Sequence, residues 1–547
     1  MPKAPYVGAI DQGTSSSRFL VLDARGTLLA SHQEEFPQIY PSAGWHEHDP
    51  WDIMDSVRSC MRRVSTKLFE MGLNPEDVKY IGIANQRETT VCWSSKDGQP
   101  FHNAIVWDDA RTKDLVSRLS NTVNPEVRES MRKKCGLQFS TYFSAIKMHW
   151  LFDTVPEIRD GLDKGVLKFG TIDSWLIYNL TGGAKHNGAH LTDVTNASRT
   201  MLMDLHTLNW DLDLCNTMGV PMSILPKIQS SAESFGQIHE DFPFAGATIT
   251  GVLGDQQAAL VGQRCFEPGD AKATYGTGSF ILFNTGNEPT FSSNGLLTTV
   301  GFKMGKDAKP FYALEGSIAV AGSAIKWLRD SMEMVKDAQE LSRLASEVED
   351  TAGVYFVTAL SGLFAPYWRD DARGTIVGLT QFTNKRHLAR ATLEATFYQI
   401  RAILESIDQD STYKLRSVKV DGGMSNSDIG MQINADLVGI DVERPMFRET
   451  TALGAIIAAG IGGGVWKADG ERTLAIEGDG AEVFRPIMHE ELRQAKYDCW
   501  KRAVERSFGW IRPGEEDAMK KKMMRQTEIN KAKRFSSKGR PVPSKIE

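Results

Sequence analysis

The sequence contains few cysteines and no paired cysteine motif. Its 547 residues include 6 cysteines, and none stands in a C-x-x-C pair or at zinc-finger spacing with histidine. This scatter favours reduced thiols in a reducing compartment over a disulfide framework or a zinc site built on cysteine. We therefore expect the cysteines to fill the core of a cytoplasmic protein.

Long apolar runs and an excess of basic residues are missing as well. No apolar run reaches the about 20 residues that cross a bilayer, and the first residues show no signal-peptide stretch. The formal net charge is -6, whereas binding to a nucleic-acid backbone needs a clustered basic face. We expect neither a transmembrane segment nor a nucleic-acid partner.

Two common nucleotide-binding motifs are absent too. The sequence has no G-x-x-x-x-G-K-[ST], and no G-x-G-x-x-G stands between a strand-like and a helix-like segment. These absences argue against a P-loop NTPase and against a dinucleotide-binding fold. What is present, 41% hydrophobic and 24% charged residues, is ordinary for a globular protein.

The first segment with a clear pattern indicates a β-hairpin. Residues 6–10 and 18–22 are apolar and flank a turn rich in Gly, Ser and Thr. Residues 271–275 and 280–283 flank a similar small-residue turn about half a chain later. This recurrence predicts that the protein consists of two halves built on one plan.

Strand-like and helix-like segments alternate elsewhere, which favours an α/β fold. We expect strands at 80–84, 247–253 and 418–421, a helix entered from a strand within 170–180, and helices at 256–262 and 452–460. The predicted domains are 1–264 and 265–510, followed by a basic tail at 511–547. The tail composition favours a solvated helix that frays into disorder, and a docking or membrane-surface arm is the alternative.

Both predicted hairpin turns carry residues suited to phosphate. The first turn presents backbone N–H groups and hydroxyls to an anion, and Arg18 adds a forked cationic donor. Asp11 fits such a place if a magnesium ion, bridged by water, lies between its carboxylate and a phosphate. The turn at 276–279 has the same chemistry, with Thr277 able to hydrogen-bond a terminal phosphate. A plain polar turn is the alternative interpretation.

Two predicted strands end in polar residues that could bind a hydroxylated substrate. Asp255 follows a buried strand together with Gln256, and its carboxylate could accept the proton of an attacking alcohol. Arg87 and Glu88 follow another strand and could bind several hydroxyls, although a surface ion pair is the alternative.

Aromatic and histidine residues admit two interpretations each. Trp107 and Phe280 could form an apolar wall against a substrate, although such residues are more often part of a core. A diglycine at Gly422 and Gly423 could let the backbone approach a nucleotide, or simply end a strand. For His46 and its neighbour two residues on, we favour packing over metal binding, because a third ligand is missing.

These segments together resemble the FGGY carbohydrate kinase family, in particular its members that phosphorylate glycerol. The similarity runs from residue 6 to about residue 510. Its most specific segments are residues 11–18, 39–41, 44–45, 47–50, 85–90, 195–201, 254–260, 274–278, 295–299, 313–316 and 365–368. The resemblance implies a two-domain actin-like ATPase (ribonuclease H-like) fold with an active-site cleft between the domains.

The resemblance also implies ATP-dependent phosphorylation of glycerol to sn-glycerol 3-phosphate, with Asp255 as the general base. The residues that would hold glycerol are Arg87, Glu88, Tyr142, Asp255, Gln256, Trp107 and Phe280. Those that would contact the nucleotide are Thr14, Ser15, Ser16, Arg18, Thr277, Gly322 and Gly423. Mg²⁺ would be anchored through Asp11 and Asp255, and the assembly would be a homodimer or homotetramer.

The chain departs from the family pattern near the nucleotide. Lys326 stands where the family often has Gln, and it could still reach a phosphate. The Asn of the segment after the diglycine comes one place early, so either Asn426 or Ser427 would face the adenine. Two rival functions stay open: a related kinase acting on a pentulose or longer polyol, and an actin-like ATPase that phosphorylates no small molecule.

Overall fold

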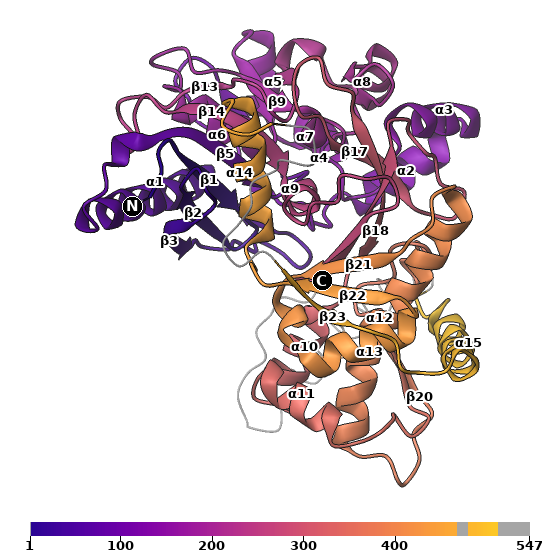
Figure 1. Cartoon of the computed structure of the whole chain (residues 1–547). Coiled ribbons are helices and arrows are strands. Elements are labelled where there is room, and N and C mark those ends of the chain that lie inside the picture. The colour runs from indigo at the N-terminus through magenta and orange to yellow at the C-terminus, as the bar shows by residue number, and fades with distance from the viewer. Residues whose placement is uncertain (1, 468–479, 512–547) are drawn as a thin grey trace, which may run out of the picture.

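The computed structural model describes residues 2–467 and 480–511, arranged around two mixed β-sheets (Figure 1). The first sheet has the order β13-β14-β5-β1-β2-β3 and the second the order β17-β18-β16-β15-β21-β22-β23. The strands of the first sheet are β13 (Gly236–Gln237), β14 (Thr248–Gly254), β5 (Val78–Asn85), β1 (Tyr6–Gln12), β2 (Ser16–Leu22) and β3 (Leu28–Glu35). Those of the second are β17 (Leu297–Phe302), β18 (Phe311–Ile318), β16 (Ser279–Gly286), β15 (Ala271–Tyr275), β21 (Ser417–Asp421), β22 (Asp441–Pro445) and β23 (Ala481–Phe484).

The two sheets repeat one topology. In the first, β1 pairs antiparallel with β2 and parallel with β5, which pairs parallel with β14. In the second, β15 pairs antiparallel with β16 and parallel with β21, which pairs parallel with β22. Each sheet then ends in an antiparallel edge strand, β13 or β23. The prediction of two halves on one plan, each opening with a hairpin, is confirmed.

Helices cover these sheets, and smaller elements fill the connections. The helices are α1 (Pro50–Glu70), α2 (Lys113–Thr122), α3 (Pro125–Cys135), α4 (Ser144–Thr154), α5 (Pro156–Asp163), α6 (Ile172–Leu180), α7 (Val194–Ala197), α8 (Leu212–Met218), α9 (Asp255–Gly262), α10 (Gly322–Asp330), α11 (Ala338–Ser346), α12 (Lys385–Asp410), α13 (Asp428–Val438), α14 (Thr450–Gly462) and α15 (Glu490–Ser507). Short 3₁₀ turns are η1 (Pro75–Asp77), η2 (Met222–Ile224) and η3 (Gly423–Asn426). The small strands are β4 (Glu47–His48), β6 (Val91–Ser94), β7 (Ala104–Ile105), β8 (Leu167–Gly170), β9 (Leu191–Asp193), β10 (Met203–Asp204), β11 (Asn209–Trp210), β12 (Lys227–Gln229), β19 (Tyr355–Val357) and β20 (Thr375–Val377).

Helix α1 shows how local sequence sets an element that supports the first hairpin. Asp49 caps it by accepting a hydrogen bond of 2.8 Å from the backbone N–H of Trp51, and Pro50 occupies the first helical position. Apolar residues at helical spacing, including Ile53 and Val57, are fully buried. They pack against β2 and β3 and hold the β1–β2 turn in place.

Helices α9 and α14 join the two halves. Figure 1 shows α14, in orange, lying in the upper part of the molecule beside β1 and β5, although its sequence follows β22 of the lower part. Its contact with α9 is close because glycines face the partner backbone. A Cβ at Gly454 would lie 1.8 Å from the carbonyl oxygen of Ala258, and one at Gly262 would lie 1.9 Å from that of Thr450. Small residues on both helices therefore allow their backbones to approach closely.

Some of the other sequence expectations for the fold are confirmed, and others stay predictions. The expected strands and helices correspond to β5, β14, β21, α6, α9 and α14. The domain limits at 264 and 510 stay predictions, and all but the first residue of the predicted basic tail lies outside the described residues. The six cysteines are free thiols, five of them buried. Among the described residues, no helix is both long and apolar enough to cross a membrane.

Candidate active site between the two sheets

The two turns that the sequence predicts to bind phosphate, residues 12–16 and 276–279, line one cavity; we call them the phosphate-type turns. In the β1–β2 hairpin, Asp11 lies opposite Arg18, and the N–H of Gly13 donates to the carbonyl oxygen of Ser16 over 2.9 Å to close the turn. This leaves Thr14 and Ser15 at the tip, where they line a cavity of about 410 Å³. The β15–β16 turn contributes to the same cavity from the other half.

Two of the predicted phosphate-binding residues are engaged elsewhere. The Ser16 hydroxyl accepts a hydrogen bond of 2.8 Å from the Gln33 side chain. Arg18 donates to Gln33 and forms an ion pair with Glu449, which precedes α14. Among the described residues that line this cavity, Ser16 and Arg18 do not appear. Arg18 therefore links the first hairpin to the second half of the chain.

The predicted substrate residues come together in this cavity. It is lined by Arg87, Glu88, Trp107, Tyr142, Asp255, Gln256 and Phe280. The Trp107 ring meets the Phe280 ring edge-on, with centroids 5.7 Å apart, and the Tyr142 ring in a similar way at 5.6 Å. The indole N–H of Trp107 donates to the Thr14 hydroxyl over 2.9 Å. The aromatic wall is thereby tied directly to the first phosphate-type turn.

Arg87 is the centre of a buried ionic network. Its guanidinium donates two hydrogen bonds to the carboxylate of Glu315, at 2.5 and 3.1 Å. The same group lies 3.2 Å from the Tyr142 hydroxyl and 3.4 Å from Oδ1 of Asp255. Because Arg87 is 2% exposed, the alternative of a surface ion pair is wrong.

A second arginine completes this network. Nε of Arg199 donates to Glu88 over 2.6 Å, and Nη2 donates to Glu315 over 3.0 Å. Arg199 and Arg87 hold the pKa of the buried Glu315 carboxyl down at about 2, although burial alone would raise it. Arg199 and Glu315 belong to segments quoted for the family resemblance, but sequence reasoning gave them no role. Glu315 is a charged residue among mostly apolar and small residues in β18, and this is the sequence signal that could have identified it.

Asp255 lies where β14 ends and α9 begins. Burial raises the pKa of this carboxyl above its ordinary value, whereas the neighbouring Arg87 and Lys272 lower it. Its Oδ1 accepts a hydrogen bond of 2.7 Å from the backbone N–H of Gln256. This carboxylate therefore faces the cavity with a raised affinity for a proton.

Lys272 is a buried cation that sequence reasoning missed. Its ammonium group donates to the side-chain oxygen of Gln256 over 2.5 Å and to the Thr274 hydroxyl over 2.9 Å. Burial lowers its pKa to about 8, while Asp421 and Asp255 act in the opposite direction. Lys272 thus supplies positive charge beside the carboxylates.

Three carboxylates influence one another electrostatically, and of these Asp255 lines the cavity. Burial raises the pKa of Asp11 to about 6, Arg18 opposes this, and Asp255 and Asp421 raise it further. Asp421 is itself held by hydrogen bonds from Gln263 at 2.9 Å and from the Thr450 hydroxyl at 2.6 Å. Carboxylate oxygens are the ligands that Mg²⁺ prefers, and Asp11 and Asp255 could supply them directly or through water.

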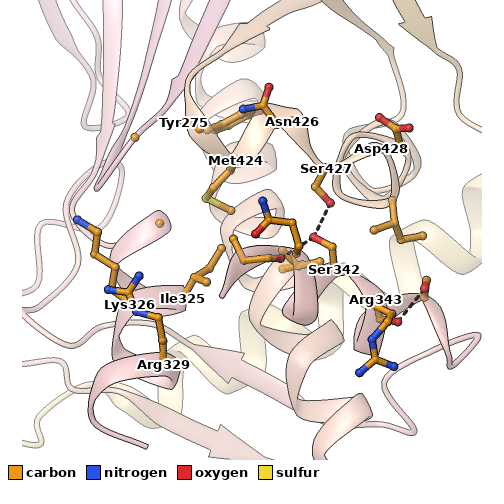
Figure 2. Close-up of a pocket in the computed structure, with 18 of the residues that line it drawn as sticks. Tyr275, Ile325, Lys326, Arg329, Ser342, Arg343, Met424, Asn426, Ser427 and Asp428 are labelled. Carbon is orange, nitrogen blue, oxygen red and sulfur yellow. Dashed lines mark hydrogen bonds between the residues drawn. The ribbon is translucent and has the colours of Figure 1, made fainter. Parts of the chain in front are cut away.

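A larger cavity of about 760 Å³ lies between the β15–β16 turn, η3 and the helices α10, α11 and α13 (Figure 2). It contains the remaining predicted nucleotide residues: Thr277, Gly322, Lys326, Gly423, Asn426 and Ser427. Gly276, Thr277 and Lys326 line both cavities, which are therefore neighbours. The close approach of α10 to the second turn requires glycine, since a Cβ at Gly322 would lie 2.5 Å from the carbonyl oxygen of Gly276.

Asn426 and Ser427 differ in what their side chains already do. The Ser427 hydroxyl caps α13 by accepting from the N–H of Gly430 over 3.1 Å, and it lies 2.9 Å from the Ser342 hydroxyl, as Figure 2 shows. Asn426 is exposed in the same cavity. Asn426 is therefore better placed than Ser427 to bind a ligand.

His48 belongs to the short strand β4, His46 precedes that strand, and both side chains are buried. The His46 ring bonds to Asp108 at 2.7 Å and to Gln38 at 2.9 Å, and the His48 ring shares the same Gln38 oxygen. Burial lowers the pKa of His48 to about 3, so its ring is neutral. These contacts agree with the packing interpretation.

Comparison with known proteins agrees with this arrangement. Models of the FGGY family of carbohydrate kinases match the chain with their N-terminal domain at residues 6–262 and their C-terminal domain at residues 271–463. The chain therefore belongs to the FGGY family of carbohydrate kinases.

Several similar proteins that match more than nine tenths of this chain are named glycerol kinases. A glycerol kinase of Arabidopsis thaliana is 50% identical, over 92% of this chain and 98% of its own length. A probable glycerol kinase of Dictyostelium discoideum is 47% identical, over 93% and 99%. The crystal structure of Plasmodium falciparum glycerol kinase with ADP superposes with a TM-score of 0.82 at 39% identity, covering 93% of this chain and 99% of that one. Xylulose kinase of Lactobacillus acidophilus, at 21% identity and a TM-score of 0.79, shares the fold.

Proposed function

We propose that this protein transfers the terminal phosphoryl group of ATP to a primary hydroxyl of glycerol, producing sn-glycerol 3-phosphate and ADP. The observation that carries the proposal is the pair of adjoining cavities. One holds Asp255 and the Arg87–Glu88 pair, the other is large enough for a nucleotide, and Thr277 belongs to both. The names of the full-length relatives support the same substrate.

Glycerol would bind in the smaller cavity through groups of opposite hydrogen-bonding polarity. Arg87 donates and Glu88 accepts, so a hydroxyl of a polyol can bond to both at once. Trp107 and Phe280 would cover the carbon–hydrogen groups, which gain from leaving water. Tyr142 and Gln256 complete the enclosure from two other elements.

Asp255 would act as the general base. Its raised proton affinity suits a carboxylate that removes a proton from an alcohol during attack on phosphorus. The turns at Thr14 and Thr277 would hold the transferring phosphoryl group between the halves, with Lys326 adding positive charge. Catalysis of this type rests on positioning and charge stabilisation, so one placed carboxylate suffices as base.

Asp11 and Asp255 would hold Mg²⁺, with Asp421 as a third acidic neighbour. When bound, the ion would neutralise phosphate charge. Burial, together with repulsion from Asp255 and Asp421, raises the pKa of Asp11, and a bound cation would oppose that shift. In the larger cavity, Gly322 and Gly423 would let the backbone approach the nucleotide, and Asn426 would face the base.

A substrate screen tests the proposal. With ATP and Mg²⁺, the purified protein should phosphorylate glycerol with a higher kcat/KM than erythritol, xylulose or dihydroxyacetone, measured by product formation. Equal or better turnover of a sugar would assign it to another branch of the family. ATP hydrolysis without any phosphorylated acceptor would instead favour an actin-like ATPase.

Lys272 provides a prediction that depends on pH. In Lys272→Met, the charge-assisted bond to Gln256 is lost, and such bonds are worth about 1.5–3 kcal/mol, so kcat/KM for glycerol should fall roughly 10- to 100-fold. In the unmodified protein, kcat/KM should decline as pH rises through about 8, because Lys272 loses its proton there. The variant should lack that decline. An unchanged alkaline limb in Lys272→Met would show that another group causes it.

Two properties stay predictions, the first by analogy with the family and the second from the scattered cysteines. They are a homodimeric or homotetrameric assembly and a cytoplasmic location. Analytical ultracentrifugation would decide the first and cell fractionation the second.

A further inference from the structure

A group of metal-ligand side chains lies away from the proposed active site. His186 belongs to the turn after α6, and His239 and Asp241 belong to the loop between β13 and β14. Each offers one ligand atom, and the three atoms all lie within 4.8 Å of one another. Neither loop contributes a residue to the two cavities described above.

The distances within this group match those around a small divalent ion. Nδ1 of His239 lies 3.2 Å from Oδ2 of Asp241. Bonds of about 2.0–2.2 Å at a tetrahedral angle place neighbouring ligand atoms roughly 3.3 Å apart. His239 and Asp241 are therefore already at ligand spacing, whereas the ligand atom of His186 lies within 4.8 Å of theirs and its ring would have to turn out of its stack with His239 to bind the same ion.

A backbone hydrogen bond and a glycine allow the two loops to lie in contact. The N–H of His239 donates to the carbonyl oxygen of Leu180 over 2.8 Å, which ties the loop to the end of α6. Gly182 has a φ of +115°, and a Cβ there would lie 2.6 Å from Cβ of His186 and 3.3 Å from Cδ2 of His239. Only glycine leaves room for the two imidazole rings, which stack with centroids 4.2 Å apart.

A metal ion at Nδ1 of His239 has to displace only a weak hydrogen bond. The backbone N–H of Asp241 donates to this nitrogen over 3.3 Å, which is longer than the usual range for an N–H donor. An imidazole nitrogen has one lone pair, so a bound ion would take the place of that N–H. The Asp241 carboxylate lies beside the same nitrogen and would be a second ligand.

We propose that His186, His239 and Asp241 form a binding site for a divalent transition-metal ion, of which Zn²⁺ is the representative. Two imidazoles and one carboxylate are a donor set that suits Zn²⁺, with water completing the coordination. The ion would cross-link the α6–β9 turn to the β13–β14 loop. Because the site requires both loops in their folded positions, bound metal stabilises the native state.

The test is a titration of chelator-treated full-length protein with ZnCl₂ in excess Mg²⁺, which occupies oxygen-rich sites. Calorimetry should show one equivalent of Zn²⁺ bound per chain, with a rise in Tm on the same samples. His186→Gln and His239→Gln should each weaken this binding by about tenfold or more and remove the rise in Tm. His206→Gln, at another exposed histidine, should behave as the unmodified protein does.

A spectroscopic measurement keeps the proposal testable even if a variant is poorly folded. Co²⁺ added to the unmodified protein should give the visible absorption of a site with nitrogen and oxygen ligands, and Zn²⁺ should abolish it. Absence of that absorption, or Zn²⁺ affinity unchanged in the His186→Gln/His239→Gln double variant, would overturn the proposal. Either result leaves the proposed kinase function untouched, because that function is measured by phosphorylation of glycerol.

Discussion

Replacement of Asp255 by asparagine is expected to lower kcat for glycerol by about 10²- to 10⁴-fold, the scale of losing a general base. The amide keeps the shape of the side chain and an oxygen that can accept the N–H of Gln256, so the fold should persist. It cannot take a proton from the attacking hydroxyl. Because the nucleotide cavity is lined by other residues, ATP should still bind.

The measurement is steady-state formation of glycerol 3-phosphate, with ATP affinity determined separately by calorimetry. Asp160→Asn, at an exposed position on α5, is the matched control and should change neither quantity. A kcat near that of the unmodified protein in Asp255→Asn would show that another group accepts the proton. Loss of ATP binding would show that Asp255 acts mainly in holding the nucleotide and its metal ion.

Replacement of Arg87 by methionine is expected to lower the free energy of unfolding by about 3–5 kcal/mol. The change removes both bonds to the buried carboxylate of Glu315, whose remaining ion pair within the described part of the chain is with Arg199. The KM for glycerol should rise about 10- to 100-fold as well, because a charge-assisted donor to the substrate is lost. Chemical denaturation and glycerol saturation curves measure the two effects.

A double variant separates stability from binding. In Arg87→Met/Glu315→Leu the uncompensated buried charge is removed, so part of the lost stability should return, whereas glycerol binding should stay impaired. Arg63→Met, at an exposed position on α1, is the control. Recovery of glycerol affinity in the double variant would mean that Arg87 supports the cavity without binding the substrate.

The hairpins were the features that local sequence predicted best. An apolar run, a turn of small residues and a second apolar run determine a β-hairpin with few alternatives, and β1–β2 and β15–β16 both follow that rule. The buried strand before Asp255 was also predictable from sequence, because it consists of aliphatic and small residues with no charged one among them. The placement of Asp255 at a strand end then followed from the general location of ligand sites in α/β sheets.

Local sequence patterns did not predict the ionic network around Arg87. Arg87 and Glu315 are 228 residues apart in sequence, and Arg199 comes from a third segment. A buried charge needs an oppositely charged or hydrogen-bonding partner, since isolated buried charges are too costly to persist. Which charge pairs with which depends on how β5, α7 and β18 approach one another, and no local pattern encodes that.

The sequence by itself therefore determined the α/β class, the duplicated plan and the chemical character of the residues at the strand ends, because these depend on periodicity and residue type over short stretches. Only the tertiary structure decided that the turns at Thr14 and Thr277 share one cavity, that Ser16 and Arg18 bond away from it, and that Lys272 is buried beside Gln256. The physical reason is that burial and pairing of charges are set by contacts between segments distant in sequence. Those contacts form only when α9 and α14 pack the two halves together.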